Sequence, residues 1–119
     1  MSVAVRYVAS HNEWNEGAWG ETLGAFGLRR AEETPEMVKV LIQPQSGRWV
    51  QGEVPLPEFK HPEHAVYIFG PDDGHLSPEI EGEYDHKVYI PQLHTNVTLY
   101  AHQAAGIVLY DRMVKHGDC

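Results

Sequence analysis

AVYIFGPDDG, residues 65–74, is the stretch of sequence that decides the fold. Residues 65–69 form a run of five apolar residues without alternation, which predicts a strand buried on both faces of a parallel sheet. The run stops at Gly70 and Pro71, where glycine allows a close approach to the backbone and proline fixes φ. Ligands of open parallel sheets bind beyond the carboxyl ends of the strands. This loop is therefore a candidate binding site, although the same residues also suit an ordinary turn.

Further strands are predicted on both sides of this stretch. Residues 3–8, 37–42 and 87–90 are rich in β-branched and aliphatic side chains, and the last of these runs ends at Pro91. Residues 48–64 are rich in proline and lack periodicity. We expect them to form a connection with at most a short strand near Trp49.

Two segments show helical periodicity. The apolar residues of segment 15–26 recur at roughly helical spacing, and Gly27 follows as a plausible stop. The pattern is stronger in residues 97–114, where the small residues 104–106 would let a helix lie close to a sheet. Strands that alternate with helices predict an α/β domain, with a mostly parallel sheet and flanking helices.

Length and composition predict one globular domain over residues 1–119. The chain is 42% hydrophobic and 22% charged, which is ordinary globular usage. No apolar run reaches the length of a membrane span, and no export signal is recognisable at the start. Cys119 has no intrachain partner for a disulfide, which fits a reducing compartment. We therefore expect a cytoplasmic protein that does not associate with membranes.

The charge balance bears on nucleic-acid binding. The chain has 9 Lys and Arg residues against 17 Asp and Glu residues, a formal net charge of −8. Phosphate binding depends largely on Lys and Arg, so this is poor composition for a general nucleic-acid binder. Arg29 and Arg30 are the only adjacent basic residues. Any contact with RNA must therefore come from a local patch.

Other motifs for chemistry are weak. His61 and His64 have metal-like spacing, but Pro62 lies between them and no third ligand is evident. We expect both to be solvated loop histidines and predict no metal site. Neither a Gly-x-Ser-x-Gly motif nor a phosphate-binding loop is present in the sequence.

Several segments, in this order, resemble the motifs of SpoU/TrmH-like RNA methyltransferases of the SPOUT (α/β-knot) superfamily. NEGA and AFG, residues 15–18 and 25–27, resemble the first motif of that family. The second and third motifs are matched by FGPDDGHLS at 69–77, VYIP at 88–91, and TLYA at 98–101 running into AAGIVLY at 104–110. The resemblance covers most of the chain, with residues 28–64 shortened.

The resemblance implies a C-terminal deep trefoil knot whose loops bind S-adenosylmethionine. It also implies a homodimer formed through the C-terminal knot helices. The implied activity is methylation of RNA, a tRNA or an rRNA, at a ribose 2′-hydroxyl. Asn15 matches an asparagine of the first motif, which implies a catalytic role. The implied cofactor-binding positions are Ile42, Phe69, Gly70, Pro71, Ile90, Pro91, Thr98 and Leu99.

The motifs are degenerate at several positions. Glu21 stands where the family has an arginine that serves the reacting ribose. In the second motif, Asp72 replaces a glutamate and His75 replaces a glycine. The third motif lacks its asparagine at Tyr100, and Asn96 is an alternative source of that amide.

Three functions therefore remain open. The first is an RNA methyltransferase that uses S-adenosylmethionine. The second is a knotted protein that binds this cofactor or a related nucleoside without transferring the methyl group. The third is a dimeric structural protein with an empty pocket.

Overall fold

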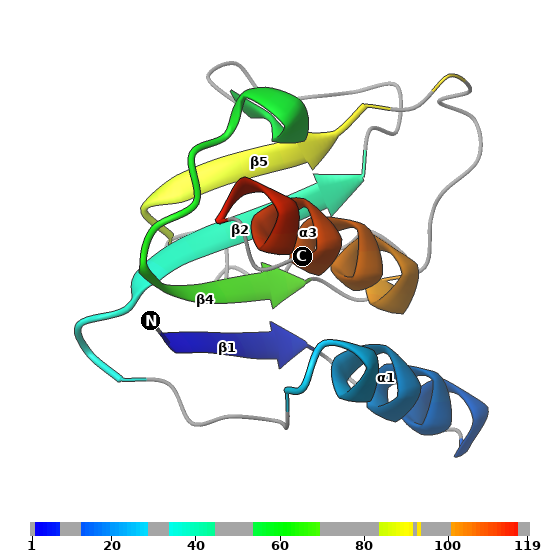
Figure 1. Cartoon of the computed structure of the whole chain (residues 1–119). Helices are drawn as coiled ribbons and strands as arrows, with labels where there is room; N and C mark the ends of the chain where they lie inside the picture. The colour runs from blue at the N-terminus through cyan, green and yellow to red at the C-terminus, as the bar shows by residue number, and fades with distance from the viewer. Residues whose placement is uncertain are drawn as a thin grey trace.

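The computed structural model describes residues 2–7, 13–28, 34–44, 54–69, 84–91, 93 and 101–116. These residues form a parallel sheet in the order β1-β4-β2-β5-β3, with helices on one face (Figure 1). The strands are β1 (Ser2–Tyr7), β2 (Val38–Pro44), β3 (Val54–Pro55), β4 (His64–Phe69) and β5 (His86–Ile90). The predicted α/β architecture with a parallel sheet is confirmed.

Register brings the carboxyl ends of the strands to one edge of the sheet. Phe69 of β4 pairs with Tyr7 of β1 and with Ile42 of β2. On the other side of β2, Pro44 pairs with Ile90 of β5. The last residues of four strands therefore follow one another along the carboxyl edge.

Strand β4 has the burial that its continuous apolar run predicts. Tyr67 and Phe69 belong to the core under the helices, whereas Val66 and Ile68 belong to a second cluster on the opposite face. All four side chains are at most 2% exposed. A strand with neighbours on both sides and apolar contacts on both faces has no need of polar residues.

Helix α1 (Glu13–Ala25) ends at a glycine, as predicted. Gly27 has a φ of 69°, in the left-handed region that favours glycine. Its N–H donates to the Gly24 carbonyl at 3.1 Å, and the Leu28 N–H donates to the Leu23 carbonyl at 2.9 Å. These two bonds form a Schellman motif, which satisfies carbonyl groups at the end of the helix.

Helix α3 (Ala101–Lys115) lies across the sheet on the same face as α1 (Figure 1). Ala104 and Ala105 are at most 2% exposed in the core between helix and sheet, as their small size predicts. A Cβ atom at Gly106 would instead meet Thr22 of α1 at 3.7 Å, so this glycine faces the other helix. Residues 97–100, which the pattern also assigns to this helix, lie outside the described residues.

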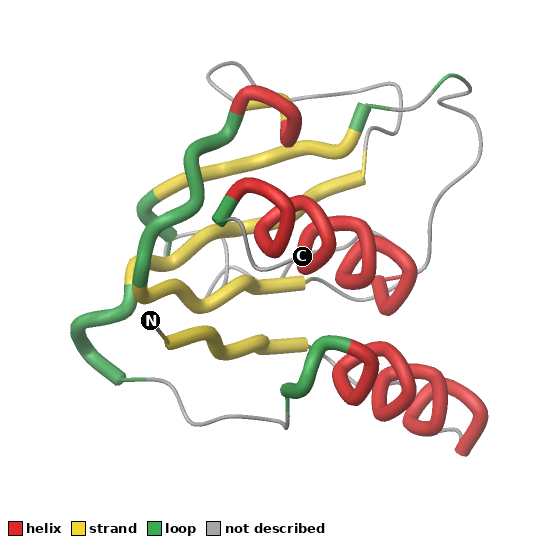
Figure 2. Tube along the Cα trace, in the orientation of Figure 1, coloured by secondary structure: helices red, strands yellow, loops and turns green. Residues whose placement is uncertain are grey.

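The connection into β4 contains a short strand and a 3-10 helix, η1 (Leu56–Glu58) (Figure 2). The strand is β3, which pairs with β5 through Val54 and Val88. The sequence predicts a connection here with at most a short strand near Trp49, and Trp49 itself lies outside the described residues. Among the described helices, none has the length and apolar character needed to cross a bilayer.

Candidate functional site

Three of the predicted cofactor-binding residues meet at the carboxyl edge of the sheet. Ile42, Phe69 and Ile90 end or nearly end three adjacent strands, and each is 2–5% exposed. Pro91 follows Ile90 and is exposed. Gly70, Pro71, Thr98 and Leu99 lie outside the described residues. The described part of the predicted site is therefore a short row of aliphatic and aromatic side chains.

Helix α1, which carries the predicted first motif, packs at this same edge. The Trp19 ring contacts the Phe69 ring edge to face, with centroids 5.6 Å apart. Trp19 lies one helical turn after Asn15, so the backbone of Asn15 is placed in a helix that touches the end of β4. The structure describes the backbone of Asn15 and not its side chain. Glu21 is exposed on the same helix.

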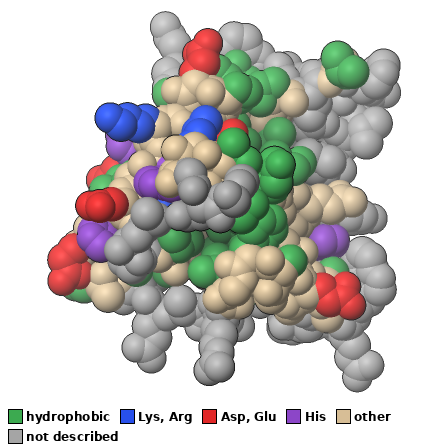
Figure 3. All heavy atoms as spheres, viewed as in Figure 1, with side chains coloured by type: hydrophobic (Ala, Val, Ile, Leu, Met, Phe, Trp, Pro, Cys, Tyr) green, Lys and Arg blue, Asp and Glu red, His purple; other side chains and the backbone are tan. Residues whose placement is uncertain are grey.

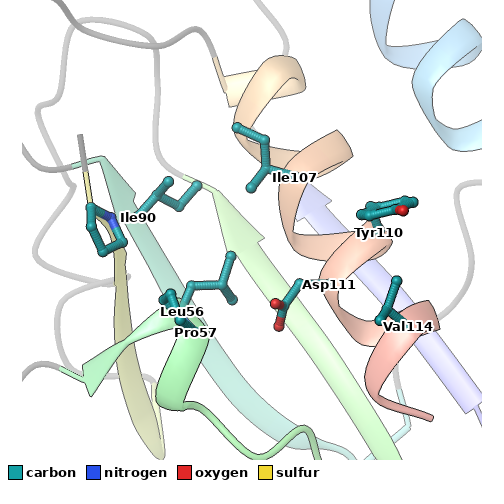
Figure 4. Close-up of a pocket in the computed structure, with 8 residues that line it drawn as sticks. Leu56, Pro57, Ile90, Ile107, Tyr110, Asp111 and Val114 are labelled. Carbon is teal, nitrogen blue, oxygen red and sulfur yellow. The ribbon is translucent and has the colours of Figure 1, made fainter. Parts of the chain in front are cut away.

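A groove opens between α3 on one side and η1 with the end of β5 on the other (Figure 4). Its volume is about 330 Å³. Eight residues line it: Leu56, Pro57, Ile90, Pro91, Ile107, Tyr110, Asp111 and Val114. The walls are mostly apolar, and Asp111 supplies a carboxylate. Ile90 and Pro91 make the groove continuous with the predicted cofactor edge.

Three of the residues by which α3 lines this groove are apolar and partly exposed to solvent. Ile107, Tyr110 and Val114 are 40%, 57% and 47% exposed. Their spacing of three and four residues places them on one side of the helix. Figure 3 shows hydrophobic side chains gathered on this face of the molecule. We call these three residues the α3 apolar stripe.

A buried polar network lies near the amino end of β4, under the C-terminal half of α3. The two ring nitrogens of His61 lie 2.7 Å from the Tyr67 hydroxyl and 2.7 Å from an Asp111 carboxylate oxygen. One Arg112 nitrogen donates to the same hydroxyl at 2.9 Å. Lys115 lies 2.8 Å from the same Asp111 oxygen. The network thus joins one strand, one helix and the segment before the strand.

Donor and acceptor roles in this network follow from Arg112. A guanidinium can only donate, so the Tyr67 oxygen accepts from it and its own proton is available for His61 Nδ1. His61 then carries its proton on Nε2 and donates to Asp111. Every member is satisfied when His61 is neutral.

Burial shifts the pKa values of two members. Burial lowers the pKa of His61 below 6.5, and the hydrogen bond to Asp111 opposes this shift. Burial also raises the pKa of the Tyr67 phenol, while the nearby Arg112 charge acts in the opposite direction. Both shifts favour the neutral forms that the hydrogen-bond pattern requires.

Two side chains in the last turns of α3 donate hydrogen bonds to backbone carbonyls of residues 56–63. Arg112 donates to the carbonyls of Pro62 and Glu63 at 2.6 and 2.9 Å. Lys115 donates to the carbonyls of Leu56 and Phe59 at 2.7 and 2.9 Å. Four carbonyl groups of residues 56–63 are thereby fixed by two side chains of one helix. This fixes the η1 wall of the groove relative to α3.

The expectation that His61 is a solvated loop histidine is wrong. His61 is 6% exposed, because the Phe59 ring packs edge to face against its ring, with centroids 5.1 Å apart, and Asp111 of α3, 50 residues later in the chain, also contacts it. One partner, Tyr67, lies on β4, and the other, Asp111, lies on a helix that sequence spacing cannot bring to it. The signal that could have identified it is the Asp111-Arg112 pair, which directly follows the uncharged run 104–110 on that helix. Among the described residues, no group of three metal-ligating side chains comes together.

Comparison with known proteins bears on the fold. No protein-family model matches the chain, and no curated protein matches it. A solved structure of a candidate RNA methyltransferase of the TrmH family, from Porphyromonas gingivalis, has a similar fold, with a TM-score of 0.71 and 17% sequence identity. The match covers 93% of this chain and 59% of that protein. At this level of identity the likeness concerns the fold alone: the described α/β architecture is shared with that structure.

Proposed function

We propose that the chain is a methyltransferase of the SPOUT type that uses S-adenosylmethionine and acts on RNA. The observation that carries the proposal is the meeting of Ile42, Phe69 and Ile90 at the carboxyl edge of three adjacent strands. Parallel α/β sheets bind ligands at this edge. The proposal is also supported by the fold shared with a candidate RNA methyltransferase of the TrmH family.

The described edge suits the adenosine end of the cofactor. In this proposal the adenine ring would pack against the aliphatic and aromatic side chains that end these strands, beside α1, whose Trp19 contacts Phe69. The loops that contain Gly70 and Thr98 would add backbone groups, in the deep trefoil knot that the resemblance implies. S-adenosylmethionine supplies the electrophilic methyl group, and the chain's own part is to hold and orient the two reactants. In this proposal Asn15 positions the acceptor.

A second function is favoured by two observations. Glu21 is exposed on α1 where the resemblance expects an arginine, and the net charge of −8 disfavours a polyanionic substrate. A protein that binds the cofactor or a related nucleoside without methyl transfer would fit both. Such a protein keeps the carboxyl-edge site and lacks the means to hold RNA.

Calorimetry with S-adenosylmethionine and S-adenosylhomocysteine tests the binding site that both functions share. We expect binding of both ligands by the wild type and its loss in Gly70→Val, since the resemblance places Gly70 against the cofactor. Gly20→Val is the matched control, because Gly20 is exposed on α1 and a Cβ atom there meets nothing within 4 Å. Equal affinities in the two variants would place the pocket elsewhere. Absence of binding by the wild type would exclude both functions and favour a structural protein with an empty pocket.

Transfer of a labelled methyl group to total RNA separates the two functions. An active wild type should lose transfer in Asn15→Ala, because the acceptor is no longer positioned. Activity that arises only in Glu21→Arg would mark the natural protein as a binder. Ribose methylation by the wild type that persists in Asn15→Ala would contradict the role given to Asn15.

We also propose that the chain is a homodimer and that the α3 apolar stripe lies in its interface. Exposed apolar side chains at helical spacing that line an apolar groove are typical of such surfaces. Sedimentation should report two chains for the wild type and one for Tyr110→Glu, which places a charge in the stripe. Gln103→Glu, on the exposed surface of the same helix, should remain dimeric. A wild-type monomer at micromolar concentration would exclude this interface.

A further inference from the structure

The hydrogen bonds around His61 are complete in one protonation state only. With neutral His61, the Tyr67 hydroxyl accepts from Arg112 and donates to His61 Nδ1. A proton added at Nδ1 would turn this acceptor into a second donor aimed at the same hydroxyl. The phenol proton would then lose its acceptor inside the core, where Tyr67 is 0% exposed. A buried donor without an acceptor is costly.

The charges around His61 also disfavour a proton. In the described network, three charged side chains contact His61 or its direct partners. Asp111 is the one anion among them, and Arg112 and Lys115 are two cations already close to the His61 ring. A protonated His61 would be a third cation in a site where it is 6% exposed. The groups that face His61 from every packed element are Tyr67 on β4, Asp111, Arg112 and Lys115 on α3, His116 just after α3, and His86 of β5 across the Phe59 ring.

The network holds a segment that has little regular structure of its own. Residues 56–63 contain η1 and then an irregular stretch up to β4. Their backbone carbonyls are bonded to α3 through Arg112 and Lys115, and the His61 ring is bonded to Asp111. Both of these side chains also contact the partners of His61. Loss of the network would therefore loosen several backbone attachments together. Leu56 and Pro57 of this segment form a wall of the groove.

We propose that His61 is a proton-operated latch. In its neutral form it holds segment 56–63 on the C-terminal half of α3, and uptake of one proton releases the segment and changes the groove that Leu56 and Pro57 line. The latch is a regulatory device of the fold, and it does not depend on which of the two proposed functions is correct.

The direction of the pH dependence follows from burial. Burial holds the pKa of His61 below 6.5 in the closed segment, and release returns it toward 6.5. The latch is therefore fully closed above pH 6.5 and weakens as the pH falls through 6.5 toward the lower pKa of the closed form. Within that window the open population rises by up to about tenfold for each unit of pH. Below the His61 pKa of the closed form, the open population stays constant.

Titration of the histidine ring protons by NMR tests the first step. The His61 resonance is assigned by its absence from His61→Gln, and we expect its midpoint below 6.5. Asp111→Asn removes the anion that favours protonation, so the midpoint should move to still lower pH. A wild-type midpoint at or above 6.5 would overturn the latch, and an unchanged midpoint in Asp111→Asn would overturn the assignment of the network.

Amide exchange of segment 56–63 tests the release. After correction for the intrinsic rate at each pH, exchange at Phe59, whose N–H donates to the Leu56 carbonyl, should accelerate as the pH falls below 6.5. His61→Gln should abolish this acceleration. His64→Gln, an exposed histidine at the start of β4, should keep it. Acceleration that persists in His61→Gln would refute the proposal, and if that variant does not fold, a wild-type exchange rate independent of pH refutes it equally.

Discussion

The carboxyl edge of the sheet and the amino end of β4 are built on different principles. At the carboxyl edge, Ile42, Phe69 and Ile90 are held by apolar contacts that have no preferred direction. At the amino end, His61, Tyr67 and their α3 partners are held by directional hydrogen bonds with assigned donors and acceptors. A substitution at an apolar edge removes only its own contacts, whereas the loss of one member of a satisfied polar network also leaves its partners unpaired. The proposed ligand site thus lies at the adaptable end of the molecule.

Helix α3 connects these two regions. Its residues Ala104 and Ala105 pack on the sheet toward the carboxyl edge, and Arg112 and Lys115 hold segment 56–63 near its other end. The groove runs between them, with Ile90 from one region and Asp111 from the other in its wall. A change in either region can therefore reach the groove.

The largest expected effect is that of Arg112→Met. Arg112 is 4% exposed and donates to two carbonyls and to the Tyr67 hydroxyl, all of which would lose a charged donor. We expect the free energy of unfolding to fall by about 3 kcal/mol or more, because hydrogen bonds to charged groups contribute about 1.5–3 kcal/mol each. Urea denaturation measures the loss. Lys60→Met, an exposed cation of the same segment, should change stability by less than about 0.5 kcal/mol. Equal losses in the two variants would show that the network does not stabilise the fold.

Ile90→Ala should have the next largest effect and should act at the other end. Ile90 is 5% exposed and lines the groove, so its truncation removes apolar contacts without leaving a polar group unpaired. We expect a loss of about 2 kcal/mol, near the lower end for buried isoleucine, since the open groove leaves little new cavity. The His61 midpoint should stay unchanged. A shift of that midpoint would show that the two regions are coupled through the sheet.

The two regions also differ in how far sequence predicts them. The strands at the carboxyl edge were predictable because uninterrupted runs such as residues 65–69 have few alternatives, and parallel pairing then places their ends together. The network at the amino end was not, since His61 and Asp111 are 50 residues apart and no local pattern joins them. The position of strand β3 within the connection 48–64 could not be predicted, because two residues, Val54 and Pro55, are too few to show periodicity.

Tyr67→Phe should have a smaller effect on the polar end. It removes one hydroxyl and leaves His61 Nδ1 and one Arg112 donor without that partner, for a loss of about 1–2 kcal/mol. The pKa of the phenol is raised in the fold by burial, so its contribution is present below pH 10 and declines as the unfolded chain ionises above it. The stability gap between wild type and variant should therefore narrow above pH 10. A gap that widens there would contradict the assignment of Tyr67 as a buried neutral donor.

The smallest expected effect is a gain, from Gly106→Ala in the middle of α3. Glycine inside a helix is less favourable than alanine by up to about 1 kcal/mol, because it loses more backbone freedom on folding. The added Cβ would meet Thr22 of α1 at 3.7 Å, which is an ordinary contact, so space does not oppose the change. We expect urea denaturation to show a stabilisation of about 0.5–1 kcal/mol. Gly106 lies between the two regions, so the variant also tests whether a stiffer α3 changes the properties of either region. If each region depends on its own contacts, the His61 midpoint and the affinity for S-adenosylmethionine should both match the wild type. A loss of stability would show that α1 and α3 pack more tightly than this contact indicates.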